Sequence, residues 1–129
     1  MRAAIYLRLS KEDKQESIEN QRALLRKYAN DHGFSVVKEY TDEAISGLTD
    51  TRPGFAKMME DARQGHFDVI LAKNQSRFSR NFLHIEQYLH RELPHLNIRF
   101  IGVTDGVDTG KINNIAVRRS GKKTRYMLL

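Results

Sequence analysis

The sequence contains no cysteine and no long apolar run. Without cysteine the chain can form neither a disulfide framework nor a thiolate metal site, which suits the cytoplasm. No apolar run approaches the roughly 18 residues that a membrane-spanning helix needs, and the apolar N-terminal segment is too short for a signal peptide. We therefore expect a cytoplasmic protein that has no membrane partner.

Several catalytic and cofactor-binding motifs are also missing. The sequence has no Walker loop for nucleotide phosphates, no Gly-x-Gly-x-x-Gly for dinucleotides and no Gly-x-Ser-x-Gly elbow. The five histidines read as surface residues and show no zinc-binding spacing. We therefore expect neither a metal nor a cofactor, and acyl hydrolysis is disfavoured.

The positive charge of the chain is confined to its end. The formal net charge is +6, from 22 basic and 16 acidic residues. All 16 acidic residues and 16 of the basic ones lie within residues 1–109, so this part is formally neutral. The other six basic residues lie in the tail, residues 110–129. DNA binding by the body of the chain must therefore depend on local clusters of cations.

Short apolar runs alternate with segments of helical periodicity along residues 1–109. The runs predict strands, and apolar residues three and four apart predict helices. The expected strands are 3–9, 34–40, 69–72 and 98–103, and the expected helices are 17–32, 53–65 and 82–94. This order is typical of a single α/β domain with a mostly parallel sheet of four or five strands and helices on both faces.

Turn and cap signals set the ends of these helices. Ser17 is expected to cap the first helix and Gly33 to end it, while Pro53 suits the first turn of the second. Pro94 is expected to close the third helix. The apolar positions expected on the core-facing side of that helix are Phe82, Ile85, Leu89 and Leu93. Residues 41–54 are expected to form a loop, and within it the long stretch from Asp42 to Arg52 is expected to be mobile.

Arg8 interrupts the apolar run of the first strand. A buried guanidinium without an anionic partner is costly, so Arg8 needs either a structural carboxylate, such as Asp42 or Asp68, or an anionic ligand. Ser10 follows two residues later and therefore points to the same face of the strand. A serine after a strand is usually a turn or cap residue, but the neighbouring guanidinium makes Ser10 a candidate nucleophile.

A second cationic cluster follows the third strand. Arg77 and Arg80 are three residues apart, so on a helical turn they would share a face while Phe78 points inward. Paired guanidiniums fit phosphate oxygens, although a solvated basic face is the alternative. Function gathers at the carboxyl ends of parallel strands. We therefore expect a cavity there, suited to phosphoryl transfer and lined by Ser10, Arg8, Arg77 and Arg80.

These residues belong to segments that resemble the signatures of serine site-specific recombinases, the resolvase and invertase family. The similar segments are Tyr6–Ser10, Asn20–Arg22, Asp42–Gly47, Arg52–Phe55 and Lys73–Asn81. Each is weak alone, but five in the family's order are highly specific. They cover about residues 1–109 and look most like the large serine recombinases of mobile elements and phages.

The resemblance implies a three-layer α/β/α resolvase-like catalytic domain. In this family a serine attacks a phosphate of double-stranded DNA, forms a 5′-phosphoserine ester and frees a 3′-hydroxyl. Strands are exchanged and rejoined within a homo-oligomer, a dimer to tetramer, without metal or cofactor. The residues that the resemblance makes catalytic are Ser10, Arg8, Arg77 and Arg80. Those that it places at the DNA phosphate or in support are Tyr6, Gln21, Asp42, Ser46, Arg52, Lys73 and Ser76.

Two features depart from the family's pattern. Position 76 is serine where the smaller resolvases carry aspartate, so an acid role is not expected there. Residues 1–109 form the expected catalytic domain, whereas the basic tail 110–129 resembles only an atypical or truncated start of the family's oligomerisation region. The isolated chain is therefore expected to be inactive or poorly active.

Two other readings use the same residues. The chain could be a catalytically silent recombinase remnant that acts through protein contacts, but the intact Arg8, Ser10, Arg77 and Arg80 disfavour this. It could instead hydrolyse small phosphate esters, but no metal site or evident general base is present to direct water. Trapping a covalent protein–DNA adduct would separate the three readings.

Overall fold

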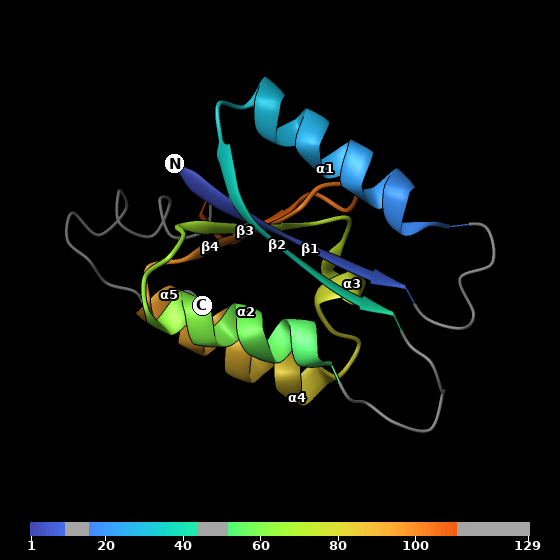
Figure 1. The fold of residues 1–129 in the computed structure, drawn as a ribbon. Helices are drawn as coiled ribbons and strands as arrows, with labels where there is room; N and C mark the ends of the chain where they lie inside the picture. Colours follow the sequence, from blue (N-terminus) through green and yellow to red (C-terminus); the bar gives the residue numbers. More distant parts are fainter. Residues whose placement is uncertain (10–15, 44–51, 111–129) are drawn as a thin grey trace.

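The computed structural model describes residues 1–9, 16–43 and 52–110, in which strands and helices alternate (Figure 1). The strands are β1 (Arg2–Leu9), β2 (Ser35–Glu43), β3 (Val69–Ala72), β4 (Arg99–Gly102) and β5 (Val107–Asp108). The helices are α1 (Ile18–Asp31), α2 (Pro53–Arg63), α3 (Gln75–Phe78), α4 (Phe82–His84) and α5 (Leu93–His95), with a π-helical segment, η1 (Ile85–Glu92), between the last two.

The strands form one five-stranded sheet in the order β2-β1-β3-β4-β5. The first four strands in this order are parallel, and β5 pairs with β4 antiparallel. Figure 1 shows α1 on one face of the sheet and α2, α4 and α5 on the other. The predicted α/β fold, with a mostly parallel sheet between two helical layers, is confirmed.

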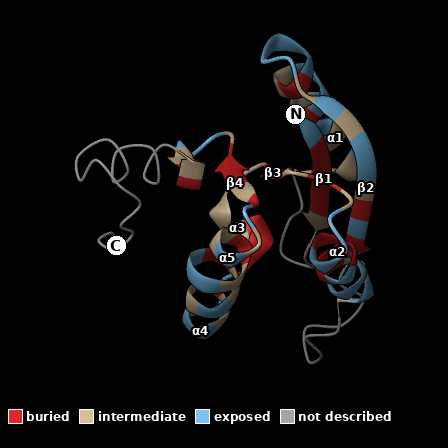
Figure 2. Ribbon diagram, turned by 90° about the vertical axis from the view of Figure 1, so that its left-hand side faces the viewer, coloured by how far each residue is buried: buried red, intermediate tan, exposed pale blue. Residues whose placement is uncertain are grey.

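The two central strands are buried on both faces. In β1, Ala4 and Tyr6 pack into the core beneath α2 and η1, whereas Ala3, Ile5 and Leu7 pack against α1. The residues of β3 divide between the two layers in the same alternation. Figure 2 shows the resulting band of buried residues along β1. Burial on both faces explains why the runs are continuously apolar, and the alternation puts Arg8 on the α2 side with Tyr6.

The predicted ends of the first two helices are confirmed. The Ser17 hydroxyl accepts a hydrogen bond from the backbone N–H of Asn20 and caps α1. Gly33 follows α1 with a φ of 76°, a conformation that glycine adopts at little cost. Pro53 is in the first turn of α2, where no N–H is needed.

The start of the predicted loop is wrong. Residues 41–43 belong to β2, because β1 extends to Leu9 and its backbone pairs with Thr41, Asp42 and Glu43. Asp42 is buried. It points inward because successive side chains of a strand point to opposite faces of the sheet. Residues 44–51, which include Ser46, lie outside the described residues, as do 10–15 and the basic tail from 111.

One prediction for the third helix is also wrong. Phe82 is 71% exposed, because the helix begins there and its buried face starts at Ile85. The predicted end at Pro94 is confirmed to within one residue, because the helical run ends at His95. The chain then turns at Asn97, which has a φ of 61°. No helix in the described part of the chain is long and apolar enough to cross a membrane.

Candidate active site

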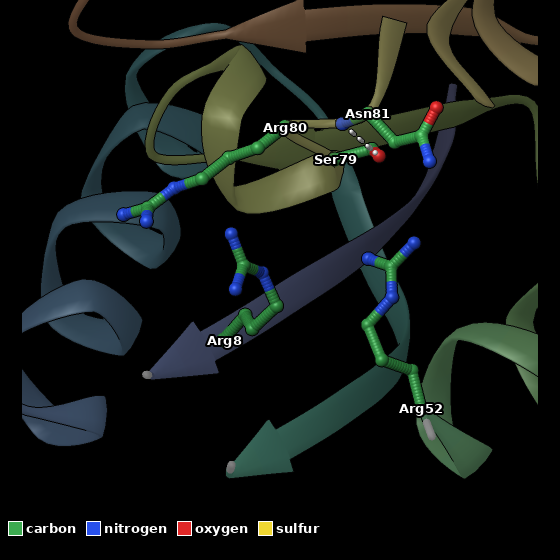
Figure 3. Close-up of a pocket in the computed structure, with 5 residues that line it drawn as sticks. All are labelled: Arg8, Arg52, Ser79, Arg80 and Asn81. Carbon is green, nitrogen blue, oxygen red and sulfur yellow. Dashed lines mark hydrogen bonds between the residues drawn. The ribbon is translucent and has the colours of Figure 1, made fainter. Parts of the chain in front are cut away.

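A polar pocket opens where the chain order across the sheet reverses. β1 has β2 on one side and β3 on the other, and ligands of such sheets bind beyond the carboxyl ends of the strands at this point. The pocket has a volume of about 300 Å³ and is lined by Arg8, Arg52, Ser79, Arg80 and Asn81. Figure 3 shows that the pocket arginines (Arg8, Arg52 and Arg80) come from β1, the start of α2 and the segment after α3.

Arg8 is held by backbone carbonyl groups. Its Nε donates a hydrogen bond to the carbonyl oxygen of Arg77 at 2.9 Å, and its Nη2 donates to the carbonyl of Ser76. The alternative of an ion pair with Asp42 or Asp68 is wrong, because both carboxylates have other partners. Asp68 pairs with Arg2 at 3.1 Å. Backbone carbonyls thus fix the Arg8 guanidinium at the pocket, and no carboxylate takes part in these hydrogen bonds.

Asp42 organises the start of α2 from the neighbouring strand. Its carboxylate accepts hydrogen bonds from the backbone N–H groups of Gly54 and Phe55, both at 2.8 Å, and from the Tyr6 hydroxyl at 2.7 Å. An anion satisfies the unpaired N–H groups of a helix N-terminus and complements its dipole. Asp42 therefore fixes the helix end that carries Arg52.

Arg52 reaches from that helix end into the pocket. Its Nη1 donates to the carbonyl of Phe78 and lies 3.4 Å from the Tyr6 hydroxyl oxygen. The guanidinium carbon is 4.1 Å from the centroid of the Phe55 ring, a distance at which the ring face attracts a cation. Arg52 thereby joins α2 to the end of α3.

Arg77 and Arg80 separate instead of sharing a helical face. Helix α3 has four residues, and its first turn is capped by Asn74, whose side chain accepts from the N–H of Arg77 at 3.1 Å. Ser79 is extended, with a φ of −169°, so Arg80 leaves the helix and is exposed at the pocket. The Arg77 side chain is 8% exposed and lies 3.9 Å from Glu16. The predicted shared face is therefore wrong, while Phe78 points inward as predicted.

The cations of the site repel one another. Burial lowers the pKa of Arg8, and the charges of Arg52, Arg80 and Arg77 lower it further. Burial raises the pKa of Tyr6, so its hydroxyl stays protonated and donates to Asp42. A bound anion would relieve the repulsion among the guanidiniums. The pocket is therefore suited to hold a phosphate group.

The other predicted residues have supporting contacts. The Gln21 side chain is buried and donates to the carbonyl of Arg8 at 2.9 Å, while its oxygen accepts from the N–H of Arg8 at 3.3 Å. This pairing holds the end of β1 against α1. The Ser76 hydroxyl donates to the Asn74 side chain at 2.8 Å, and Lys73 forms an ion pair with Glu16. Ser10 and Ser46 lie outside the described residues.

Sequence reasoning missed Glu16, Ser79 and Asn81. Ser79 and Asn81 lie within the segment that carries the arginines, and Ser79 accepts a hydrogen bond from the N–H of Asn81 at 3.0 Å. Their place in the pocket depends on the extended backbone at Ser79, which the local sequence does not signal. Within 1–9, 16–43 and 52–110, no group of three His, Cys, Asp or Glu side chains could hold a metal ion.

Comparison with known proteins identifies the fold as that of recombinase catalytic domains. Residues 3–118 match the family described as "Resolvase, N terminal domain". The chain belongs to this family. The N-terminal catalytic domain of TP901-1 integrase shares 30% sequence identity with it, with a TM-score of 0.71, and the match covers 85% of this chain and 82% of that chain.

Two further recombinase structures are similar over most of the chain. A site-specific recombinase from Streptococcus pneumoniae shares 26% identity, with a TM-score of 0.76, over 94% of this chain and 84% of that one. The catalytic domain of ISC1926 TnpA, an IS607-like serine recombinase, shares 27% identity, with a TM-score of 0.68, over 97% and 89%. The resemblance to serine recombinases that the motifs predicted is confirmed.

Proposed function

We propose that this chain is the catalytic domain of a serine site-specific recombinase and that Ser10 is its nucleophile. The observation that carries the proposal is the pocket at the switch point of the sheet, where Arg8, Arg52 and Arg80 converge. Its chemistry matches the phosphate of a DNA backbone, and the family match agrees with such a substrate. Ser10 follows β1 two residues after Arg8.

The proposed reaction transfers a phosphoryl group from one oxygen to another. The Ser10 Oγ loses its proton and attacks phosphorus, while the bond from phosphorus to the 3′ oxygen breaks. The products are a 5′-phosphoserine ester and a free 3′-hydroxyl, which takes up a proton. Negative charge grows on the phosphoryl oxygens in the transition state, and preorganised guanidiniums stabilise it without reorganisation. Rejoining is the same reaction in reverse.

The contacts of the supporting residues suggest distinct roles. Gln21 fixes the backbone of Arg8, and Asp42 with Tyr6 fixes the helix end that carries Arg52. Lys73 and Arg77 add positive charge behind the pocket, while Ser76 and Ser46 are proposed to contact DNA or support the site. The full reaction is proposed to take place on double-stranded DNA within a dimer to tetramer of such subunits, with residues 1–109 as the catalytic unit and 110–129 as a separate tail.

The proposal can be tested with a duplex that favours the first step. The probe is a pool of duplexes with randomised flanks around one phosphate whose 3′ bridging oxygen is replaced by sulfur. Attack on this phosphate releases a 3′-thiolate, a good leaving group that reverses the reaction poorly, so the ester accumulates even in a slow enzyme. The readout is a denaturing gel that detects protein covalently linked to DNA, with Ser10→Ala as the control.

Each result of this test corresponds to one reading of the sequence. A covalent adduct with the wild-type chain and none with Ser10→Ala supports the recombinase. Release of a free 5′-phosphate without an adduct favours the phosphate-ester hydrolase. The absence of both products favours the silent remnant that acts through protein contacts.

A further inference from the structure

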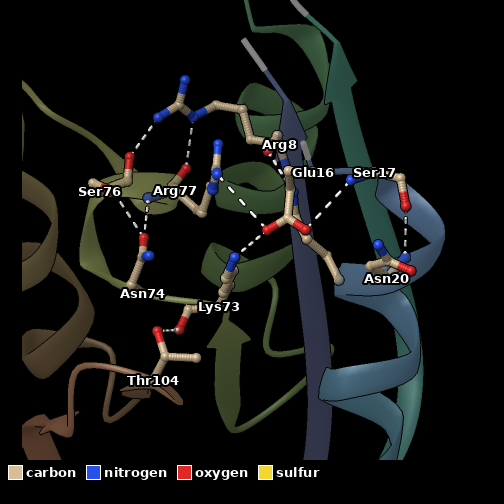
Figure 4. Close-up of polar contacts among 10 residues, drawn as sticks. Arg8, Glu16, Ser17, Asn20, Lys73, Asn74, Ser76, Arg77 and Thr104 are labelled. Carbon is tan, nitrogen blue, oxygen red and sulfur yellow. Dashed lines mark hydrogen bonds and ion pairs between the residues drawn. The ribbon is translucent and has the colours of Figure 1, made fainter. Parts of the chain in front are cut away.

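The two cations behind the pocket, Lys73 and Arg77, lie beside one carboxylate, that of Glu16. Glu16 precedes the cap of α1 and its side chain is only 14% exposed. One carboxylate oxygen, Oε2, forms an ion pair with Lys73 and lies 3.9 Å from Nη2 of Arg77. The other, Oε1, accepts from the backbone N–H of Ser17 at 3.3 Å. Figure 4 shows the Glu16 carboxylate between these two cations and the start of α1.

Arg77 connects the Glu16 carboxylate to the pocket, because it lies close to Glu16 and its carbonyl accepts from Arg8. Arg8 lines the pocket and donates to the backbone carbonyls of Ser76 and Arg77, next to the Glu16 contacts (Figure 4). The charge of Arg77 is among the causes that lower the pKa of Arg8. A negative charge beside Arg77 therefore offsets part of the positive charge that faces Arg8.

The Asp42 carboxylate does not have contacts of the kind that Glu16 has. Its carboxylate accepts from the Tyr6 hydroxyl and from two backbone N–H groups at the start of α2. Its charge is thereby engaged in fixing a helix end. The Glu16 carboxylate instead faces Lys73 and Arg77, whose side chains are of the types that bind phosphate.

We propose that Glu16 is an internal counter-anion of the active site. It occupies Lys73 and Arg77 while no DNA phosphate is bound, and it competes with that phosphate when DNA arrives. The inference rests on the function proposed above and adds a regulatory element to the same site. Its consequence is that the charge of Glu16 weakens the binding of a phosphodiester, whereas a purely structural Glu16 would support it.

The test uses dimethyl phosphate, a phosphodiester that has one charge and no bases. It is titrated into the full chain, and the Nε–H resonance of Arg52, which also lines the pocket, reports binding in every variant. Glu16→Gln keeps the size of the side chain and removes its charge. We expect it to bind dimethyl phosphate about three- to tenfold more tightly than the wild type, the scale of losing one unit charge at close range in a partly buried site.

Two variants control for net charge and for geometry. Glu19→Gln makes the same change in net charge three residues away, at a side chain that is 81% exposed, and it is expected to leave the affinity unchanged. Glu16→Asp keeps the charge and is expected to stay within about twofold of the wild type. Lys73→Gln removes one of the two cations, so that Glu16 faces Arg77 alone. It is expected to weaken the binding of dimethyl phosphate. This variant keeps the test valid even if Glu16→Gln fails to fold.

The outcomes separate this inference from the proposed function. Tighter binding by Glu16→Gln, with Glu19→Gln unchanged, supports the competition. Equal or weaker binding by Glu16→Gln overturns it, provided that Arg80→Ala abolishes the response and so locates the phosphate in the pocket. If Arg80→Ala binds as the wild type does, the phosphate site itself is wrong and the inference fails with it. For Lys73→Gln, unchanged or tighter binding contradicts the competition.

Discussion

At the scale of single residues, the arginines of the site differ in what holds them. Arg8 is fixed by two carbonyl groups, and Arg52 by a carbonyl and an aromatic ring. Arg77 is buried beside Glu16, whereas Arg80 is exposed at the pocket. Substitutions should therefore separate the chemistry of the site from the stability of the fold.

We expect Arg80→Ala to lose activity without losing stability. Its free energy of unfolding should stay within about 0.5 kcal/mol of the wild type, as is usual for exposed side chains. The rate of adduct formation on the phosphorothiolate duplex should fall about 100-fold or more, because one preorganised cation is missing in the transition state. Arg77→Ala should in contrast cost roughly 1–3 kcal/mol, because it breaks a buried polar contact. Urea unfolding and adduct kinetics on both variants check this, and a stable Arg77→Ala beside an unstable Arg80→Ala would contradict it.

The sequence predicts which residues come together at the site better than it predicts their detailed arrangement. Strand ends alone place Arg8 and the segment that carries Arg80 at one edge of the sheet, because parallel strands end together. The separation of Arg77 from Arg80 could not be predicted, since it depends on one extended residue, Ser79. Glu16 was missed because its partners, Lys73 and Arg77, are about 60 residues away in the chain. No local pattern reports such a contact.

At the scale of elements, the start of α2 is fixed by its close approach to β2. A Cβ atom on Gly54 would lie 2.7 Å from the backbone oxygen of Thr41 and 3.0 Å from the Asp42 carboxylate oxygens. The N–H of Gly54 also donates to that carboxylate at 2.8 Å. The helix end therefore has no room for a side chain at this position.

We expect Gly54→Ala to destabilise the fold by about 1–3 kcal/mol, because the backbone must shift to remove the overlap. The same shift should displace Arg52 and slow adduct formation. Chemical denaturation measures the first effect and the gel assay the second. Ala56→Ser is the matched control on an exposed position of the same helix. A Gly54→Ala variant as stable as the control would show that the contact with β2 is not tight.

A buried carboxylate at the other end of α2 makes the fold sensitive to acid. Asp61 accepts a hydrogen bond from the Tyr40 hydroxyl at 2.6 Å. That bond, with the nearby charge of Lys57, holds the pKa of Asp61 below its ordinary value against the effect of burial. A carboxylate with a depressed pKa contributes stability above its unfolded pKa of about 3.9, and this is lost as the pH falls through the lower folded pKa.

Asp61→Asn should therefore be less stable than the wild type at pH 7, and the difference should shrink between pH 4 and pH 2. The physical reason is that the wild type alone loses the charged contact as Asp61 is protonated. Urea unfolding across this range measures the effect, and Asp31→Asn, at an exposed carboxylate, serves as the control. If the difference in unfolding free energy between the wild type and Asp61→Asn does not change with pH, this assignment of the low pKa is contradicted.

The α/β order and most element ends could be predicted because they depend on local signals. Continuous apolar runs, the Ser17 cap and Pro53 each act within one turn of chain. The extension of β2 to Glu43 could not be predicted, because residues 41–43 are held by pairing with β1 and not by their own propensity. The exposure of Phe82 was also missed, because the buried face of the third helix begins only at Ile85.

At the scale of the whole molecule, charge is divided between a neutral body and a basic tail. Residues 1–109 carry equal numbers of acidic and basic residues, and the tail, residues 110–129, carries six basic ones. The pocket arginines are a local excess within the neutral body. Long-range attraction to DNA and recognition of one phosphate should therefore depend on different parts of the chain.

We expect the chain to bind duplex DNA weakly, with little sequence preference, and mainly through the tail. Affinity should fall with salt at a log–log slope of about −0.9 for each phosphate contacted. Deleting residues 110–129 should remove most of this slope, whereas Ser10→Ala should leave it unchanged. Fluorescence anisotropy at several salt concentrations makes the measurement. A steep slope that persists after the deletion would assign the binding to the body of the chain.

The most direct test of the central claim is to identify the residue that becomes linked to DNA. Ser79 is the rival, because its side chain also lines the pocket between the arginines. The adduct formed on the phosphorothiolate duplex is digested with protease and nuclease, and tandem mass spectrometry locates the remaining nucleotide. Linkage to Ser10, persisting in Ser79→Ala and absent in Ser10→Ala, is the predicted result. Linkage to Ser79 or to any other residue would contradict the claim that Ser10 is the nucleophile.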